Sequence, residues 1–108
     1  MAGTRKTGQT LLVVDDEPNI RKVLEAIFTR EGYRVLLAEC GTTALRLAAE
    51  NQIHVLITDL IMPDMNGVEV LQNVKKNYPS CAAIIITAYG TIRSAVEATH
   101  AGAFDYLQ

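Results

Sequence analysis

The sequence predicts an α/β domain in which a parallel β-sheet is covered by helices on both faces. Short apolar runs, typical of buried strands, alternate along the chain with segments whose apolar residues follow helical spacing. Strands and helices that alternate in this way form right-handed crossover units around a parallel sheet. The runs are nearly all apolar, as expected of strands that are buried on both faces.

Length and composition favour one domain without a direct nucleic-acid or membrane partner. The chain has 108 residues, which suits a domain of about 100–150 residues. A formal net charge of −2 gives no basic surface for nucleic acid or anionic lipid. No apolar stretch approaches the ~20 residues of a membrane span. Cys40 and Cys81 lack C-x-x-C spacing, and we interpret them as reduced thiols of a cytoplasmic protein.

The first half of the chain contains two predicted strand–helix units. Residues 1–10 are polar and are interpreted as a flexible N-terminal arm, followed by a strand at 11–14. Asp16-Glu17-Pro18 starts a helix with an acidic cap and a proline in its first turn, and Gly32 fits its end. Residues 33–38 predict a second strand and 42–50 a second helix. The apolar stripe of the first helix consists of Ile20, Val23, Leu24, Ile27 and Phe28.

The second half repeats this alternation. Residues 55–59 predict the third strand, and a loop at 60–67 leads into a helix that carries Val68, Leu71 and Val74. The fourth strand is expected at 82–87 and a fourth helix at about 91–101. Residues 103–107 begin a fifth strand. No repeat, low-complexity tract or linker indicates a second domain.

Three of the apolar runs end in side chains that carry oxygen. The first ends at Asp15-Asp16, the third at Asp59 and the fourth at Thr87. In an open parallel sheet the carboxyl ends of the strands share one edge, which is where ligands bind. Because clustered carboxylates repel one another, stability does not explain this arrangement. It favours a function that needs negative oxygens, such as binding a hard cation or attacking phosphorus.

This edge has the groups that phosphoryl transfer to a carboxylate requires. Mg²⁺ prefers oxygen ligands and takes one or two protein carboxylates, which Asp15 and Asp16 supply. Asp59 is the best nucleophile for an acyl phosphate, and Thr87 is placed to donate a hydrogen bond to a phosphoryl oxygen. Taken singly, the Asp-Asp pair also reads as a helix cap, and Asp59 as a turn residue. Their joint placement at strand ends favours the functional interpretation.

The motifs together resemble those of response-regulator receiver domains of two-component signalling. The resemblance runs from Leu11 to the end of the chain, and it implies a flavodoxin-like, doubly wound sheet with strand order 2-1-3-4-5. It also indicates receivers attached to transcription-activating ATPases, so a natural full-length chain continues into an effector domain that binds DNA. The matching stretches are LVVDDEP (12–18), TDLIMPDMNG (58–67), IITAYG (85–90) and GAFDYL (102–107).

The resemblance implies a role for each site residue. Asp59 accepts phosphate from the phosphohistidine of a sensor histidine kinase. Asp15, Asp16, Asp59 and the backbone carbonyl of Ile61 hold Mg²⁺. Thr87 is the switch hydroxyl and Tyr106 the coupled aromatic residue, so phosphorylation reshapes the surface around helix four and strand five. The domain promotes only its own phosphorylation and dephosphorylation, and it is not an enzyme of metabolism.

The sequence departs from the family pattern at its end. Receivers carry a lysine just beyond the fifth strand and then a fifth helix, whereas this sequence ends at Gln108. We therefore interpret residues 11–108 as a receiver domain without that lysine and helix, and the chain as a fragment. Because the fifth helix shares a sheet face with the first, apolar surface is expected to be exposed there and covered by association, as in a homodimer.

Three other functions compete with this interpretation. Phosphatases with an aspartate nucleophile place a second acid two residues later, where this chain has Ile61. A dinucleotide-binding module would have G-x-G-x-x-G after the first strand, and none is present. A receiver-like interaction module that is not phosphorylated in this truncated form remains the alternative.

Overall fold

The computed structural model describes residues 7–86, 102 and 105–107, and it shows five parallel strands in one sheet. The order β2-β1-β3-β4-β5 confirms the predicted doubly wound, flavodoxin-like topology. Thr87 and the fourth helix expected at 91–101 lie outside the described residues. The elements are β1 (Thr10–Val14), α1 (Pro18–Arg30), β2 (Arg34–Ala38), α2 (Gly41–Glu50), β3 (Val55–Asp59), α3 (Gly67–Asn77), β4 (Ala82–Ile86) and β5 (Asp105–Leu107).

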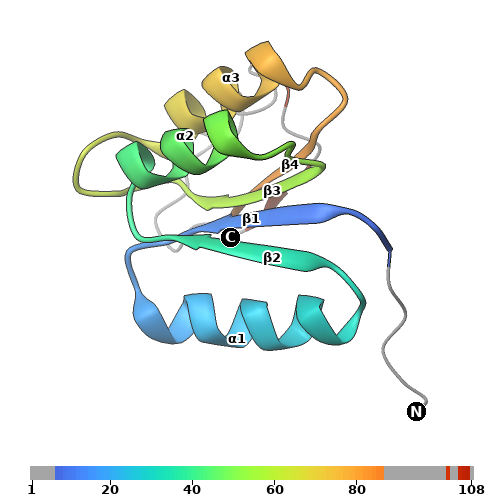
Figure 1. Ribbon diagram of the computed structural model, residues 1–108. Helices are drawn as coiled ribbons and strands as arrows, with labels where there is room; N and C mark the ends of the chain where they lie inside the picture. Colours follow the sequence, from blue (N-terminus) through green and yellow to red (C-terminus); the bar gives the residue numbers. More distant parts are fainter. Residues whose placement is uncertain (1–6, 87–101, 103–104, 108) are drawn as a thin grey trace.

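The described helices form two layers on the sheet. Helix α1 covers one face, and α2 and α3 lie together on the other (Figure 1). The larger core cluster lies under α2 and α3 and includes Leu12, Leu56, Leu71 and Ile85. A smaller cluster around Leu11, Val13 and Ile57 faces α1. Within the described part of the chain, no helix is long and apolar enough to span a membrane.

The boundaries of α1 follow from its predicted start and stop signals. Glu17 is the N-cap and its side chain accepts a hydrogen bond from Asn19 N, with Pro18 in the first turn. Gly32 follows the helix with a φ of 96°, a conformation that glycine adopts without a Cβ penalty. The N–H groups of Gly32 and Tyr33 donate to Thr29 O and Phe28 O, which is the Schellman pattern. The Phe28 and Tyr33 rings meet edge to face, with centroids 5.9 Å apart.

Some predicted boundaries shift. β1 begins at Thr10, and Thr7 N donates to Gly32 O, so the last residues of the expected arm are already tied to the fold. The remainder of that arm, residues 1–6, is outside the described part. β2 begins at Arg34 rather than Tyr33, because Tyr33 completes the α1 end. α2 begins at Gly41 rather than Thr42.

The apolar stripe of α1 is only partly covered. Leu24 and Phe28 pack against the smaller core cluster. Ile20, Val23 and Ile27 are 42%, 55% and 48% exposed. The sequence correctly predicts the helix and its stripe, and the exposure of these three residues agrees with the expectation of an incompletely covered face.

Candidate metal centre

The sheet register places the acidic residues at one edge. Val14 of β1 pairs with Thr58 of β3, so the residues that follow them, Asp15 and Asp59, leave neighbouring strands at the same level. Asp59 is itself the last residue of β3 and pairs with Ile86 of β4. The side chain of Thr58 is fully buried and donates to Asp59 O at 3.0 Å, which fixes the strand end.

The structure brings together the three carboxylates that the sequence singles out. Asp15, Asp16 and Asp59 each offer an oxygen, and these oxygens lie within 4.8 Å of one another. Asp16 is exposed, Asp59 is half-buried, and Asp15 is only 9% exposed. The predicted convergence is therefore confirmed, while the roles of the three residues remain predictions.

Burial and mutual repulsion raise the pKa of two of these groups. The pKa of Asp15 is raised mainly by burial and further by the charge of Asp16, against the opposing effects of the Glu17 N–H and of Arg21. The pKa of Asp59 is raised by burial and by the charge of Asp15, although hydrogen bonds from the backbone N–H groups of Ile61 and Leu60 lower it. A cation at this point would relieve both penalties.

The turn after β1 is held by two hydrogen bonds. Glu17 N donates to Asp15 Oδ1 at 2.9 Å, and Arg21 Nη1 donates to the backbone carbonyl of Asp15 at 2.6 Å. The sequence interpretation did not identify Arg21. The sequence does place this arginine in the first turns of the predicted helix, six residues after Asp15, which is close enough to suggest a contact with the turn after β1.

The loop after β3 is closed at its base. Gly67 N donates to Leu60 O at 2.7 Å. A Cβ at Gly67 would collide with the carbonyl oxygen of Asp59, so this close approach requires glycine. Asn66 caps α3 by accepting from Glu69 N at 2.9 Å. Ile61 lies in this closed loop two residues after Asp59, and its side chain is 53% exposed.

The structure describes only one of the two predicted switch residues, and only through its backbone. Thr87 lies outside the described residues. Tyr106 belongs to β5, where it pairs with Ile85 of β4, so only its backbone position is described. Their expected roles remain predictions.

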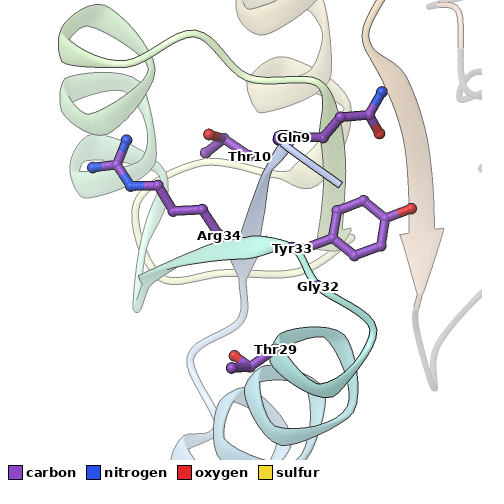
Figure 2. Close-up of a pocket in the computed structure, with 7 residues that line it drawn as sticks. Gln9, Thr10, Thr29, Gly32, Tyr33 and Arg34 are labelled. Atoms are coloured by element: carbon purple, nitrogen blue, oxygen red, sulfur yellow. The ribbon is translucent and has the colours of Figure 1, made fainter. Parts of the chain in front are cut away.

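A separate pocket lies at the opposite edge of the sheet. Its volume is about 470 Å³, and it is lined by residues near the starts of β1 and β2 and the end of α1. Figure 2 shows Tyr33 and Arg34 pointing to opposite sides rather than converging. The described residues that line it include no carboxylate, so it is not an alternative to the acidic cluster.

The donor set at the acidic cluster fits a hard divalent cation. Three carboxylates supply oxygens, which Mg²⁺ and Ca²⁺ prefer over nitrogen or sulfur. The cysteines, Cys40 and Cys81, are not part of the cluster. The residues present therefore match a magnesium-type site.

Comparison with known proteins shows the family. The model of the response regulator receiver domain family matches residues 11–108. The chain belongs to this family. It is 43% identical over 95 residues to the DNA-binding transcriptional regulator NtrC of Proteus hauseri, covering 88% of this chain and 20% of that protein. The chain thus spans about a fifth of the length of such curated relatives.

Solved receiver structures share the fold. A response regulator protein from Burkholderia pseudomallei, crystallised with a phosphorylated aspartic acid, calcium ion and citrate, is 28% identical with a TM-score of 0.86. The match covers 92% of this chain and 58% of that one. The response regulator protein TrrA of Thermotoga maritima, in complex with Mg²⁺-BeF, is 36% identical with a TM-score of 0.80, over 92% and 84% of the two chains.

Proposed function

We propose that this receiver domain is a phosphoryl-accepting switch of a two-component system, with Asp59 as the phosphoacceptor. The observation that carries the proposal is the set of three carboxylate oxygens within 4.8 Å at the ends of β1 and β3. Burial and mutual repulsion raise the pKa values of Asp15 and Asp59, a penalty that a bound cation would relieve. Family membership and the phosphorylated aspartic acid of the Burkholderia relative support the same chemistry.

The residues divide the work between metal binding and bond formation. Asp15 and Asp16, with Asp59 and the carbonyl of Ile61, hold Mg²⁺, which neutralises charge on the phosphoryl oxygens. An oxygen of Asp59 attacks phosphorus as the bond from phosphorus to the kinase histidine nitrogen breaks, and the electron pair stays on that nitrogen. Hydrolysis of the acyl phosphate later restores the carboxylate. The domain thus acts only on itself.

The conformational response is assigned to the end of the sheet next to the site. Thr87 follows directly after Ile86, the residue that pairs with Asp59, and this position suits a hydroxyl that donates to the phosphoryl group. Tyr106 belongs to the neighbouring strand β5. We propose that the two residues move together and change the surface of strand five and the helix expected at 91–101.

The partners follow from the chemistry and from the relatives. The phosphate donor is a sensor histidine kinase, and the domain that responds to phosphorylation is an effector domain in a longer chain. The regulator NtrC of Proteus hauseri is described as DNA-binding, so DNA contact is proposed through such a further domain and not through this one. A cytoplasmic location is part of the proposal, since Cys40 and Cys81 are free thiols.

We also propose that the exposed face of α1 is covered by a second copy of this chain. Ile20, Val23 and Ile27 are each more than 40% exposed, and contiguous exposed apolar side chains mark association surfaces. Light scattering across a concentration series should show a dimer that Val23→Asp abolishes. A strictly monomeric wild-type chain at all concentrations would contradict this part of the proposal.

The central experiment is mass spectrometry after incubation with acetyl phosphate and Mg²⁺. Four chains are compared: the wild type and the wild type extended through a fifth helix, each with and without Asp59→Asn. We expect the extended chain to gain one phosphoryl group and Asp59→Asn to gain none. Labelling that persists in an Asp59→Asn version of the extended chain would refute the assignment. An extended wild-type chain without labelling would favour the alternative, an interaction module that is not phosphorylated.

A further inference from the structure

The first turn of α2 is capped by a side chain from another segment. Gly41 N donates to Asp64 Oδ1 at 2.9 Å, and Thr42 N donates to Asp64 Oδ2 at 2.8 Å. The hydroxyl of Thr42 adds a third bond to Oδ2 at 2.6 Å. Cys40, the residue at the N-cap position itself, makes no capping hydrogen bond through its side chain. Asp64 therefore takes the place of the local cap, from the loop that follows Asp59.

The same loop makes an apolar contact with this turn. A Cβ at Gly41 would collide with Cγ of Met65, and it would lie 2.6 Å from Sδ, so glycine is needed for Met65 to pack there. Met65 is half-buried against the larger core cluster. Asp64 and Met65 together form a clasp, a name used below for these two residues and their contacts with Gly41 and Thr42.

The clasp and the loop base fix the segment between them. At the base, Gly67 N bonds to Leu60 O, directly after Asp59. Leu60 and Met62 are buried, whereas Pro63, Asp64 and Asn66 are exposed. In the exposed half of the loop, Asp64 bonds to the first turn of α2, whereas Asn66 bonds to α3. The three bonds from Thr42 and Gly41 hold the pKa of Asp64 well below its usual range.

We propose that Asp64 is a positioning residue for the magnesium and phosphoryl site, because it holds the loop that carries Ile61 against the first turn of α2. The inference rests on the proposed function, since it concerns the carbonyl of Ile61 as a metal ligand. Asp64 itself lies outside the three-carboxylate cluster. Its charge also matches the partial positive charge of a helix N-terminus, which favours an anion at this point.

Positioning through the loop has two measurable consequences. Residues that orient metal ligands from outside the coordination sphere change affinity by about 10–100-fold when removed, and the indirect position of Asp64 points to the lower end, about tenfold. Coupling between two sites is reciprocal. Mg²⁺ bound at Asp59 should therefore slow amide hydrogen exchange at Gly41 and Thr42, although neither residue belongs to the acidic cluster.

The test uses two substitutions of graded severity and one matched control. Asp64→Ala removes all three bonds, while Asp64→Asn keeps one acceptor oxygen and should have the smaller effect. Thr43→Val is the control. Thr43 lies in the same first turn of α2, but its hydroxyl donates to Glu39 rather than to the loop. For each chain we would measure the Mg²⁺ dissociation constant by calorimetry, amide exchange by NMR with and without Mg²⁺, and melting temperature.

We expect Asp64→Ala to weaken Mg²⁺ binding about tenfold, Asp64→Asn less, and Thr43→Val not at all. In wild type and Thr43→Val, Mg²⁺ should slow exchange of the Gly41 and Thr42 amides, and in Asp64→Ala it should not. Equal Mg²⁺ affinity in wild type and both Asp64 variants would overturn the inference while leaving the proposed function intact. Should Asp64→Ala fail to fold, Asp64→Asn decides by the same comparison. Wild type without Mg²⁺ binding would instead remove the proposed function and, with it, this inference.

Discussion

Replacing Asp59 by asparagine should have opposite effects on stability without and with Mg²⁺. Without a cation, the carboxylates of Asp15, Asp16 and Asp59 repel one another, and burial adds to the penalty for ionised Asp59. Asparagine removes the charge and keeps an oxygen that can accept the backbone hydrogen bonds of the loop. The metal-free variant should therefore be more stable than the wild type.

The size of this effect follows from the separation of the oxygens. Two unit charges at the 4.8 Å limit of the cluster repel by about 0.9 kcal/mol in bulk water, and by about 3.5 kcal/mol at an effective dielectric constant of 20. Since Asp59 and Asp16 are partly in solvent, screening places the gain nearer the lower value. We expect about 1–2 kcal/mol, or about 4–9 °C in melting temperature for a domain of this size.

The assay is urea unfolding followed by far-UV circular dichroism, in EDTA and in Mg²⁺ at low ionic strength. The free energy of unfolding of the wild type should rise by about 2.7 kcal/mol at a Mg²⁺ concentration 100-fold above its dissociation constant, and that of Asp59→Asn should rise much less. Glu25→Gln, a charge removal on the exposed side of α1, is the control and should respond to Mg²⁺ as wild type does. Equal wild-type and Asp59→Asn midpoints in EDTA would refute the repulsion argument. An equal gain in Mg²⁺ would refute Asp59 as a ligand.

Three further predictions concern a buried thiol, two close glycine contacts and a helix cap. Burial raises the pKa of the Cys81 thiol from 9.0 to about 11. As the pH rises, the unfolded chain therefore loses this proton before the folded chain does. The free energy of unfolding, measured by urea at each pH, should fall between about pH 9 and 11 more steeply in wild type than in Cys81→Ser. Equal slopes of unfolding free energy against pH in the two chains would contradict this. Gly67→Ala should lower the free energy of unfolding by about 3 kcal/mol, because its Cβ meets the backbone of Asp59. Gly41→Ala should lower it by only about 1 kcal/mol, because the flexible side chain of Met65 can move. Equal melting temperatures of the two variants would count against this. Asn66→Ala removes the cap of α3 and should cost about 1 kcal/mol in unfolding free energy, with no loss as the contrary result.

Much of the fold could be predicted because its signals are local. The apolar runs, the Glu17 and Pro18 helix start and the Gly32 stop each involve residues close in sequence, and the structure confirms them. The convergence of Asp15 and Asp59 could also be predicted, because parallel strands share their carboxyl ends.

The contacts that hold the site in place could not be predicted in the same way. The sequence places Asp64 in the loop at 60–67 and indicates no partner for it, yet its partner amides belong to Gly41 and Thr42, more than twenty positions away. Such a contact depends on how α2 and the loop after β3 approach each other, and the spacing of residues in the sequence does not predict it. The bond from Arg21 to the Asp15 carbonyl likewise requires the exact path of the turn after β1.

The carboxylates at this edge divide into two groups by what their surroundings offer. Glu39 and Asp64 accept hydrogen bonds from threonine hydroxyls, and Asp64 also from two helix amides, so their pKa values are lowered. Asp15 and Asp59 are more buried and face other acids, so their pKa values are raised. Asp15 and Asp59 also accept backbone hydrogen bonds, but these do not offset the burial that raises their pKa values. Residual, unsatisfied charge is a common feature of functional sites, and here it would be compensated only when a cation binds.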